Sequence, residues 1–280
     1  EVKVKSIIWT GGGEPWVNKH LNEAILLAHE KNIDMGMATN GALLDEGKIR
    51  TIVKTHKYLR FSFDAGTAET YSKVHRGINK DFEKVIENMK LAAKIKNELN
   101  SKISLGASFL VYPENLEEIV ISAKIVKECG LDFFQIKPVV MHHGVQLPKD
   151  LFVRANKYIE EAKKLSDENF KCIIINYKFE DIMSEENNYG RAYKKCWGNP
   201  LLCSISAEGE VYLCCHLRGF SEYSFGNINK ESFKDIWNSE KRKEAIRNIN
   251  FAKCQPLCKL HETNKILNFL KHPHPHKNIL

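Results

Sequence analysis

Short apolar runs that alternate with helix-like patterns constrain the fold of this chain most strongly. Candidate strands occupy residues 3–10, 33–41, 58–66, 102–112 and 132–140. Between them lie segments with apolar residues on one helical face, at 17–32, 45–55, 81–97 and 115–130. Strands joined by helices of this length form parallel βαβ units. The pattern therefore predicts an α/β fold in which the strands form a barrel or partial barrel.

The second half of the chain has a different pattern. A helix is expected at 149–166 and a strand at 172–179, and residues 202–216 show two apolar stretches around a turn, which predicts a β-hairpin. A further helix is expected at 232–249. We predict a partial barrel over residues 1–150, a linker helix and strand over 151–195, and a small cysteine-rich α+β domain with a C-terminal tail over 196–280.

Composition excludes several classes of protein. The 280 residues carry a net charge of +7, but the lysines are scattered and form no dense basic block. No apolar run approaches the roughly 20 residues that a membrane span needs, and no signal-peptide pattern is present. We therefore expect neither a nucleic-acid partner nor a membrane partner, and we expect a cytoplasmic protein.

Cysteines are concentrated in the second half. Of eight cysteines, none lies in the first 128 residues and six lie between Cys196 and Cys258. Such clustering in a large chain favours metal binding over disulfides. Thiolates from separated segments can converge on a soft metal or an iron–sulfur cluster, and the candidate ligands are Cys196, Cys214, Cys254 and Cys258. A zinc site made by the same four thiolates and a set of buried free cysteines are the alternatives.

Two more cysteines of this region compete for the same site. Cys203 is separate, and Cys215 follows Cys214 directly. Neighbouring residues of a strand point to opposite faces, so Cys214 and Cys215 do not easily bind one cluster together. Whether Cys203, Cys215 or His261 joins the site is left open by the sequence.

Glycine and polar residues follow the candidate strands. The first strand ends in "TGGGEP", residues 10–15. Glycines allow the backbone to approach a ligand closely, and the carboxylate of Glu14 suits a bound ammonium group. A tight turn before a helix, with an acid and a proline at its start, is the alternative. Because ligands gather at the carboxyl ends of parallel strands, a small-molecule site is expected there.

This series of strand ends resembles the radical S-adenosylmethionine (SAM) superfamily over about residues 4–140. The matching stretches are "TGGGEP", "ATNGALL", "LRFSFDAGTAETYSKVHRG", "SFLVYPENLEE" and "FQIKP". The resemblance implies that the methionine amine of SAM is bound by Gly11, Gly12, Gly13 and Glu14. It implies that Ser62 and Arg76 contact the methionine carboxylate, where a guanidinium can pair bidentately. Asn40, Asp64 and Ser108 are further SAM-contact candidates.

The sequence departs from that family at one point. Radical SAM enzymes hold a catalytic 4Fe–4S cluster with a CxxxCxxC motif after the first barrel strand, and this sequence lacks the motif ahead of residue 6. We expect that the first βα unit and its cysteines are missing from this chain, and that the fragment alone is inactive.

The cysteine-rich half resembles the auxiliary-cluster domain of the same superfamily, of SPASM or shorter twitch type. The resemblance favours Cys214 over Cys215, and a twitch domain with one auxiliary 4Fe–4S cluster. The last cysteine pair, Cys254 and Cys258, is one residue longer than the family's usual CxxC.

The resemblance implies an enzyme that abstracts hydrogen from its substrate through a 5′-deoxyadenosyl radical, with a net oxidation assisted by the auxiliary cluster. The expected partners are a small-molecule, carrier-linked or peptide substrate and a flavodoxin or ferredoxin-type electron donor. The alternatives are a peptide-modifying maturase and a non-catalytic zinc- or cluster-binding scaffold. An aldolase-like barrel would use Lys137 as a Schiff-base lysine.

Overall fold

The computed structural model describes residues 2–76, 79–139, 150–175, 179, 191, 193–250, 254 and 258–273. The chain divides into two compact units, one from Val4 to Phe179 and one made of residues 1–3 and 180–280. Among the described residues, none of the helices combines the length and the apolar character needed to cross a membrane.

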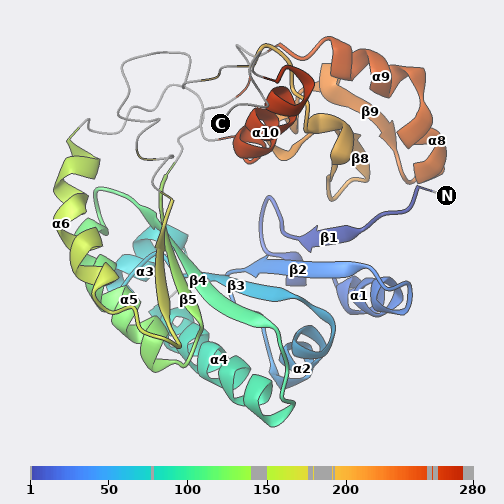
Figure 1. Ribbon diagram of the computed structural model, residues 1–280. Helices are drawn as coiled ribbons and strands as arrows, with labels where there is room; N and C mark the ends of the chain where they lie inside the picture. The colour runs from blue at the N-terminus through green and yellow to red at the C-terminus, as the bar shows by residue number, and fades with distance from the viewer. Residues whose placement is uncertain are drawn as a thin grey trace. The chain divides into compact units, whose positions relative to one another are not determined.

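The first unit is built on a six-stranded sheet whose strands lie in chain order. Every neighbouring pair is parallel. The strands are β1 (Ser6–Trp9), β2 (Asp34–Thr39), β3 (Tyr58–Ser62), β4 (Ser104–Val111), β5 (Phe133–Pro138) and β6 (Lys171–Ile174). The sheet is curved and open, with β1 and β6 at its edges (Figure 1). The predicted α/β fold with a partial parallel barrel is confirmed.

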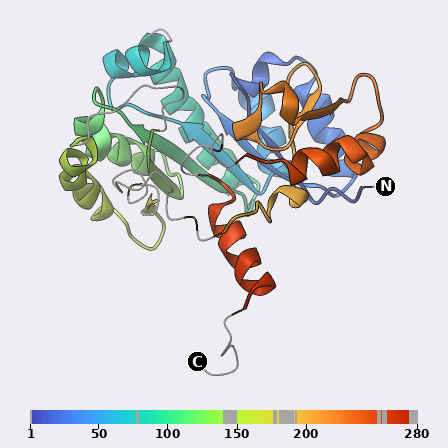
Figure 2. The same cartoon turned by 90° about the horizontal axis from the view of Figure 1, so that it is seen from above.

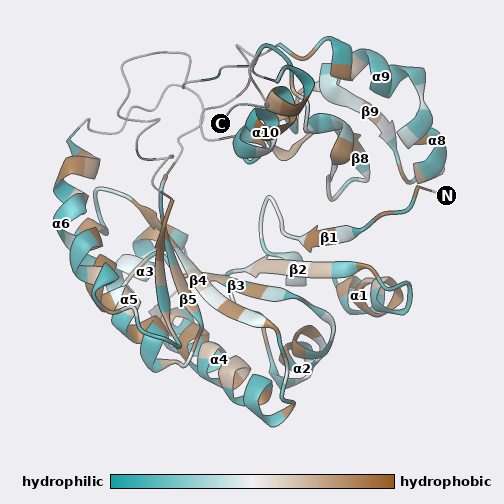
Figure 3. Ribbon diagram, in the orientation of Figure 1, coloured by the Kyte–Doolittle hydropathy of each residue, from teal (hydrophilic) through white to brown (hydrophobic). Residues whose placement is uncertain are grey.

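Helices cover one face of this sheet (Figures 1 and 2). They are α1 (Leu21–Glu30), α2 (Glu46–Thr55), α3 (Ala68–His75), α4 (Asn79–Glu98), α5 (Ile119–Glu128) and α6 (Leu151–Lys163), with short 3-10 turns η1 (Pro15–Val17) and η2 (Leu116–Glu118). Figure 3 shows that α4 and α5 carry both apolar and polar stretches. Burial of their apolar side chains against the sheet is the main force that holds this unit together.

Alternation along the strands separates the two faces of the sheet. In β3, Leu59 and Phe61 are fully buried, whereas Tyr58, Arg60 and Ser62 between them are half-buried. Successive side chains of a strand point to opposite faces, so the first pair packs under the helices and the second set lies on the opposite face. We call that opposite face the helix-free face.

The segment predicted as a linker contains elements of the first unit. Helix α6 contacts α5 and β6, and β6 pairs in parallel with β5. The division between the two units falls after Phe179.

The second unit contains a three-stranded sheet of order β7-β8-β9. Its strands are β7 (Ser204–Ile205), β8 (Glu210–Tyr212) and β9 (Ser224–Asn227), and its helices are α8 (Phe233–Asn238), α9 (Glu240–Arg247) and α10 (His261–Lys271). The 3-10 turns are η3 (Asn199–Leu201), η4 (Cys215–Leu217) and η5 (Ser221–Tyr223). Strands β7 and β8 are antiparallel and form the predicted hairpin. Its turn uses Gly209 at φ +82°, a conformation that glycine adopts without strain.

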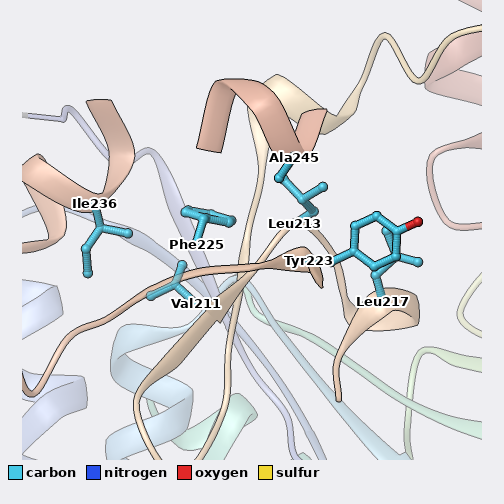
Figure 4. Packing of buried hydrophobic residues seen from close by; sticks show 7 residues of the cluster. All are labelled: Val211, Leu213, Leu217, Tyr223, Phe225, Ile236 and Ala245. Carbon is cyan, nitrogen blue, oxygen red and sulfur yellow. The ribbon is translucent and has the colours of Figure 1, made fainter. Parts of the chain in front are cut away.

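Among the described residues of the second unit, the buried hydrophobic core is small. It consists of Val211, Leu213, Leu217, Tyr223, Phe225, Ile236 and Ala245 (Figure 4). The half-buried side chains of Cys203 and Cys214 pack against it. So few apolar residues bury little surface, and domains of this kind commonly depend on a bound metal for stability.

One predicted helix, at 232–249, is divided in two. Ser239 has an extended backbone, with φ −62° and ψ 149°, and its side chain accepts a hydrogen bond from Arg242 N. It thereby acts as the N-cap of α9 and ends α8 at the preceding residue.

Candidate functional site

The glycine loop after β1 combines a tight turn with an open side. A Cβ atom on Gly11 would come within 2.5 Å of the carbonyl oxygen of Gly13, so only glycine fits the turn there. A Cβ atom on Gly13 would meet no atom within 4 Å. The loop therefore leaves space at Gly13 in which a ligand can approach the backbone.

Glu14 connects this loop to the end of β2. Its carboxylate accepts hydrogen bonds from Thr39 Oγ1 at 2.7 Å, from Asn40 N at 2.7 Å and from Trp16 N at 3.2 Å. A carboxylate offers about four lone-pair positions. These three contacts fix the orientation of the Glu14 side chain and leave acceptor capacity for about one more donor.

The turn after β2 is held by its own side chains. Thr39 Oγ1 accepts from Gly41 N at 3.0 Å, and Asn40 Oδ1 accepts from Ala42 N at 2.9 Å. The buried amide of Asn88 donates to Gly41 O at 2.8 Å. The structure thus brings Glu14 and Asn40 together, as strands that end at one edge of a parallel sheet should.

Ser62 and Ser108 are register partners on β3 and β4, and both belong to the helix-free face. Asp64 follows β3 and is buried, with Oδ1 accepting from Leu110 N at 2.6 Å. Its Oδ2 lies 3.5 Å from His75 Nε2. Burial raises the pKa of Asp64 to about 7. Asp64 therefore connects β3, β4 and α3 from within the protein.

His75 ends α3 directly before Arg76. Its ring stacks on Tyr71 with centroids 4.3 Å apart, and Tyr71 in turn packs on Phe82 at 5.7 Å. Burial lowers the pKa of His75 to about 4, so the ring is neutral at neutral pH. This aromatic packing fixes the end of α3, and with it the backbone position of Arg76.

Glu118 fixes the other end of α3. Its Oε2 accepts from Gly66 N at 2.6 Å and Thr67 N at 3.2 Å, while Oε1 accepts from Thr67 Oγ1 at 2.9 Å and Thr70 Oγ1 at 2.8 Å. Thr67 is the N-cap of α3. A carboxylate at a helix N-terminus is favoured by the orphan N–H groups there, so the loop after β4 holds the helix that carries Arg76.

These features fit a ligand with an amino-acid head group. The open backbone at Gly13 and the carboxylate of Glu14, which can accept a further hydrogen bond, lie together at the ends of β1 and β2. Arg76 directly follows α3. An ammonium group suits the first pair and a carboxylate suits the guanidinium. The chemistry of the residues present therefore fits the methionine moiety of SAM.

In the second unit, five cysteines, namely Cys196, Cys214, Cys215, Cys254 and Cys258, are linked by electrostatic interactions. The pKa of Cys254 is raised to about 11, by burial first and then by the charges of Cys258 and Cys196. The pKa of Cys214 is raised to about 12, by burial first and then by Cys215 and Cys258. All four predicted ligands are therefore close enough to interact, and the soft thiolate set fits an iron–sulfur cluster.

Hydrogen-bond donors reach several of these sulfurs. Asn264 Nδ2 donates to Cys196 Sγ at 3.6 Å, and Leu260 N donates to Cys258 Sγ at 3.4 Å. The side-chain oxygen of Asn264 accepts from Gly198 N at 2.8 Å. Backbone N–H groups of His216 and Leu217 stabilise the Cys214 thiolate. Such donors orient ligands and tune a cluster.

The cysteines are not preassembled into a coordination site. Within the described parts of the chain, no three side chains of His, Cys, Asp or Glu lie in a metal-binding arrangement. Burial raises the pKa of Cys203 to about 11, and its charged neighbour is Arg242 rather than another cysteine. The ring of His261 contacts Tyr193 OH through Nδ1 at 3.1 Å.

Comparison with known proteins decides the family. The radical SAM superfamily model matches residues 1–126, and the model of an iron–sulfur cluster-binding domain, SPASM, matches residues 196–259. The chain belongs to the radical SAM superfamily. The resemblance and the cofactors predicted from the sequence are confirmed, since a radical SAM domain implies SAM and a 4Fe–4S cluster and a SPASM domain implies auxiliary iron–sulfur clusters.

Proteins of several kinds are similar to this chain. The tungsten-containing aldehyde ferredoxin oxidoreductase cofactor-modifying protein of Pyrococcus furiosus is 22% identical over 85% of the chain and 68% of its own length. The PqqA peptide cyclase of Granulibacter bethesdensis is 22% identical over 81% of the chain and 59% of its own length. The chain thus spans about 60 to 70% of the length of these two relatives.

Among solved structures, SuiB of Streptococcus suis has the same fold. It superposes with a TM-score of 0.65 at 15% identity, covering 96% of the chain and 64% of SuiB. SuiB has also been solved with SAM and with its precursor peptide SuiA.

Several residues of the site were not predicted from the sequence. Thr39, which binds Glu14, lies inside the quoted motif "ATNGALL", and His75 precedes Arg76 in "VHRG". Their positions inside the motifs were the available signal. Glu118 and Asn264 contact residues 51 and 68 positions away, and neither has a local signature.

Proposed function

We propose that this radical SAM protein binds SAM at the carboxyl edge of its sheet and abstracts hydrogen from a substrate. The observation that carries the proposal is the joining of the glycine loop to the end of β2 through Glu14. The residues proposed to contact SAM are Gly11, Gly12, Gly13, Glu14, Asn40, Ser62, Asp64, Arg76 and Ser108.

Each part of the site has a positioning task. The loop backbone around Gly13 and the remaining acceptor capacity of Glu14 bind the amine of SAM, and Arg76 pairs with its carboxylate. Asp64 also holds β4 and His75 in place. When bound, SAM and the reduced 4Fe–4S cluster supply a 5′-deoxyadenosyl radical that abstracts hydrogen. Orientation of the reacting groups is the main contribution of the protein.

In the second unit we propose Cys196, Cys214, Cys254 and Cys258 as ligands of an auxiliary iron–sulfur cluster. The charges of these cysteines affect one another, although Cys215 takes part in the same interactions, so the choice of Cys214 over Cys215 rests on the family resemblance. We leave Cys203 out of this set, because its charged neighbour is Arg242 rather than another cysteine. The auxiliary cluster would accept an electron from the substrate, giving a net oxidation.

Two relatives act on peptides, since one is named a PqqA peptide cyclase and SuiB has been solved with a precursor peptide. These names support a peptide substrate over a small or carrier-linked one. The electron donor would be a flavodoxin or a ferredoxin-type protein. Thiolate ligands persist in a reducing compartment, which supports a cytoplasmic location.

Calorimetric titration of the anaerobically iron–sulfur-loaded protein with SAM tests the proposal. Replacing Arg76 by Ala should weaken SAM binding about tenfold or more, because a charge-assisted pair is lost. Arg154→Ala, on the surface of α6, serves as the matched control and should leave the affinity unchanged. Equal affinity in both variants would reject the assigned site.

The zinc-binding scaffold makes a different prediction. It requires colourless protein with stoichiometric zinc after anaerobic purification, whereas the proposed function requires iron and sulfide. Metal analysis of the wild-type protein and of Cys258→Ser, with Cys172→Ser as control, separates the two.

A further inference from the structure

The helix-free face of the six-stranded sheet carries polar side chains that the proposed SAM site does not use. Arg60 of β3 is in register with Gly106 of β4, which is in register with Phe133 of β5. Gln135 and Lys137 follow Phe133 in two-residue steps and therefore point to the same face. We call Arg60, Gln135 and Lys137 the cationic cluster.

The guanidinium of Arg60 is held on one side. Its Nη1 donates to Gln135 Oε1 at 3.3 Å, which reaches from β3 across β4 to β5. The ring of Phe133 covers Gly106, and the ring of Tyr58 covers Gly36, so that any Cβ atom on either glycine would overlap a ring. Arg60 therefore lies on a surface with aromatic rings on both sides.

One donor of Arg60 has no partner. Its Nε is buried and makes no hydrogen bond within the part of the chain that the structure describes. Leaving a buried donor unsatisfied costs about 1–3 kcal/mol, and such groups are rare in native proteins. An acceptor that is brought by a ligand would remove this cost once the side chains that cover Nε move aside.

Charge on this face is positive near Arg60. Both Arg60 and Lys137 act on the charge of Asp64, whose carboxyl group is directed at Leu110 N and His75. Burial raises the pKa of Asp64 to about 7, so it is only partly ionised near neutral pH and offsets the two cations incompletely. At the other end of the sheet, Asp34 already pairs with Lys57 at 3.3 Å.

We propose that the cationic cluster binds a carboxylate of the substrate, with the Nε edge of Arg60 as its main contact. A guanidinium pairs with a carboxylate through two parallel N–H donors, and the contact to Gln135 fixes the plane of this fork. The assignment rests on the proposed function, because that function requires a substrate close to the SAM site at the ends of these strands. It makes Arg60 a specificity-determining residue for an acidic substrate.

Calorimetric titration with succinate tests the assignment, with SAM present in excess so that the site at Arg76 is occupied. The full chain should bind succinate saturably and should not bind succinamide, which has the same shape without charge. Arg60→Gln should raise the Kd for succinate about tenfold or more, since a charged hydrogen-bonded pair is lost. Arg60→Lys keeps the positive charge but loses the two parallel N–H donors of the guanidinium, so its Kd for succinate should lie between those of wild type and Arg60→Gln.

Arg154→Gln is the matched control, because it removes one positive charge from the surface of α6 and should leave succinate binding unchanged. Equal succinate affinity in wild type and Arg60→Gln overturns the proposal, as does tighter binding of inorganic phosphate than of succinate. Retained SAM binding by Arg60→Gln shows that the variant is folded. Absence of SAM binding in the wild type would reject the proposed function instead. The difference in succinate affinity between wild type and Arg60→Gln would still test the assignment, because Arg76 is the same in both.

Discussion

Arg76 holds a left-handed backbone conformation with φ of 53°. A residue with left-handed backbone conformation also follows helices α1, α4 and α5. These residues are Asn32, Asn100 and Gly130, and asparagine and glycine tolerate that conformation. An arginine there costs about 1 kcal/mol relative to glycine. The strain indicates that this side chain is kept for function, in agreement with the proposed contact to the carboxylate of SAM.

Replacing Arg76 by Gly should therefore separate stability from binding. We expect Tm to rise by about 2–4 °C as the strain is relieved, while the Kd for SAM rises about tenfold or more. Differential scanning calorimetry and SAM titration measure the two effects. Asn100→Gly, at the end of α4, is the control and should stabilise the protein slightly without changing SAM affinity. Unchanged SAM binding in Arg76→Gly would contradict the proposed role.

Asp64 should make stability depend on pH. Because burial raises its pKa from 3.8 to about 7, the native state keeps a proton that the unfolded state has lost between these values. The contribution of Asp64 to stability is thus present at low pH and is lost as pH rises through about 7. His75, with a pKa lowered by burial to about 4, acts in the opposite direction below pH 6.5.

Asp64→Asn isolates the carboxyl group, because the amide can still accept from Leu110 N and donate towards His75. The Tm of the variant relative to wild type should rise by several degrees between pH 5 and pH 8, since one pKa unit corresponds to about 1.4 kcal/mol. Thermal unfolding from pH 5 to pH 8 measures the difference. A difference that does not vary with pH would argue against a raised pKa.

Asn264 is buried and donates to the sulfur of Cys196. Hydrogen bonds to cluster sulfurs stabilise the more negative, reduced state. Asn264→Leu should therefore make the reduction potential of the auxiliary cluster more negative, as measured by an EPR-monitored redox titration. Asn268→Leu, one turn later, loses only the contact to Trp197 Nε1 at 3.0 Å. Equal shifts in both variants would show a packing effect rather than a hydrogen-bond effect.

At the scale of elements, α3 is fixed at both ends by other segments. Glu118 of η2 binds the backbone and side chains at its start, and the rings of Tyr71 and His75 pack near its end. The position of Arg76 therefore depends, through α3, on the position of the loop between β4 and α5. The proposed SAM site depends on this helix as a rigid element rather than on a flexible loop.

Glu118→Ala should destabilise the protein by about 2 kcal/mol, because hydrogen bonds to a charged acceptor are lost. It should also weaken SAM binding, since the start of α3 is released. Chemical denaturation and SAM titration are the measurements. The neighbouring Glu117 is exposed, and Glu117→Ala should have little effect on either quantity. Similar results for the two variants would remove Glu118 from the site.

For the whole molecule, the two units differ in how they are stabilised. The six-stranded sheet buries many large side chains under its helices, including Phe61, Phe109 and Phe134. The second unit has the small core shown in Figure 4 and several half-buried cysteines. We infer that metal binding supplies a larger share of the folding free energy in the second unit.

Oxidative removal of iron should therefore loosen the second unit selectively. Hydrogen exchange is expected to become faster in β8, β9 and α10 after treatment with ferricyanide and a chelator, while β3 and β4 stay protected. Mass spectrometry of peptides from both units measures this. Equal loss of protection in both units, or no change in either, would contradict the inference.

Local patterns in the sequence were sufficient to predict the parallel strands, the β-hairpin and the family. Strand and helix periodicity is carried by neighbouring residues, and parallel strands end at one edge by geometry. The candidates Glu14 and Asn40 could therefore be placed near each other before the structure was known. The break at Ser239 and the strand β9 were missed, because their signals are short.

Contacts between distant segments were decided by the tertiary structure. Strand register and the path of each loop decide three such features. Glu118 caps α3, Asn264 donates to Cys196, and the Nε of Arg60 has no hydrogen-bond partner within the described residues. A hydrogen bond requires positions correct to a fraction of an ångström, and residue order does not carry that information. Periodicity determined which elements form, and packing decided which side chains meet.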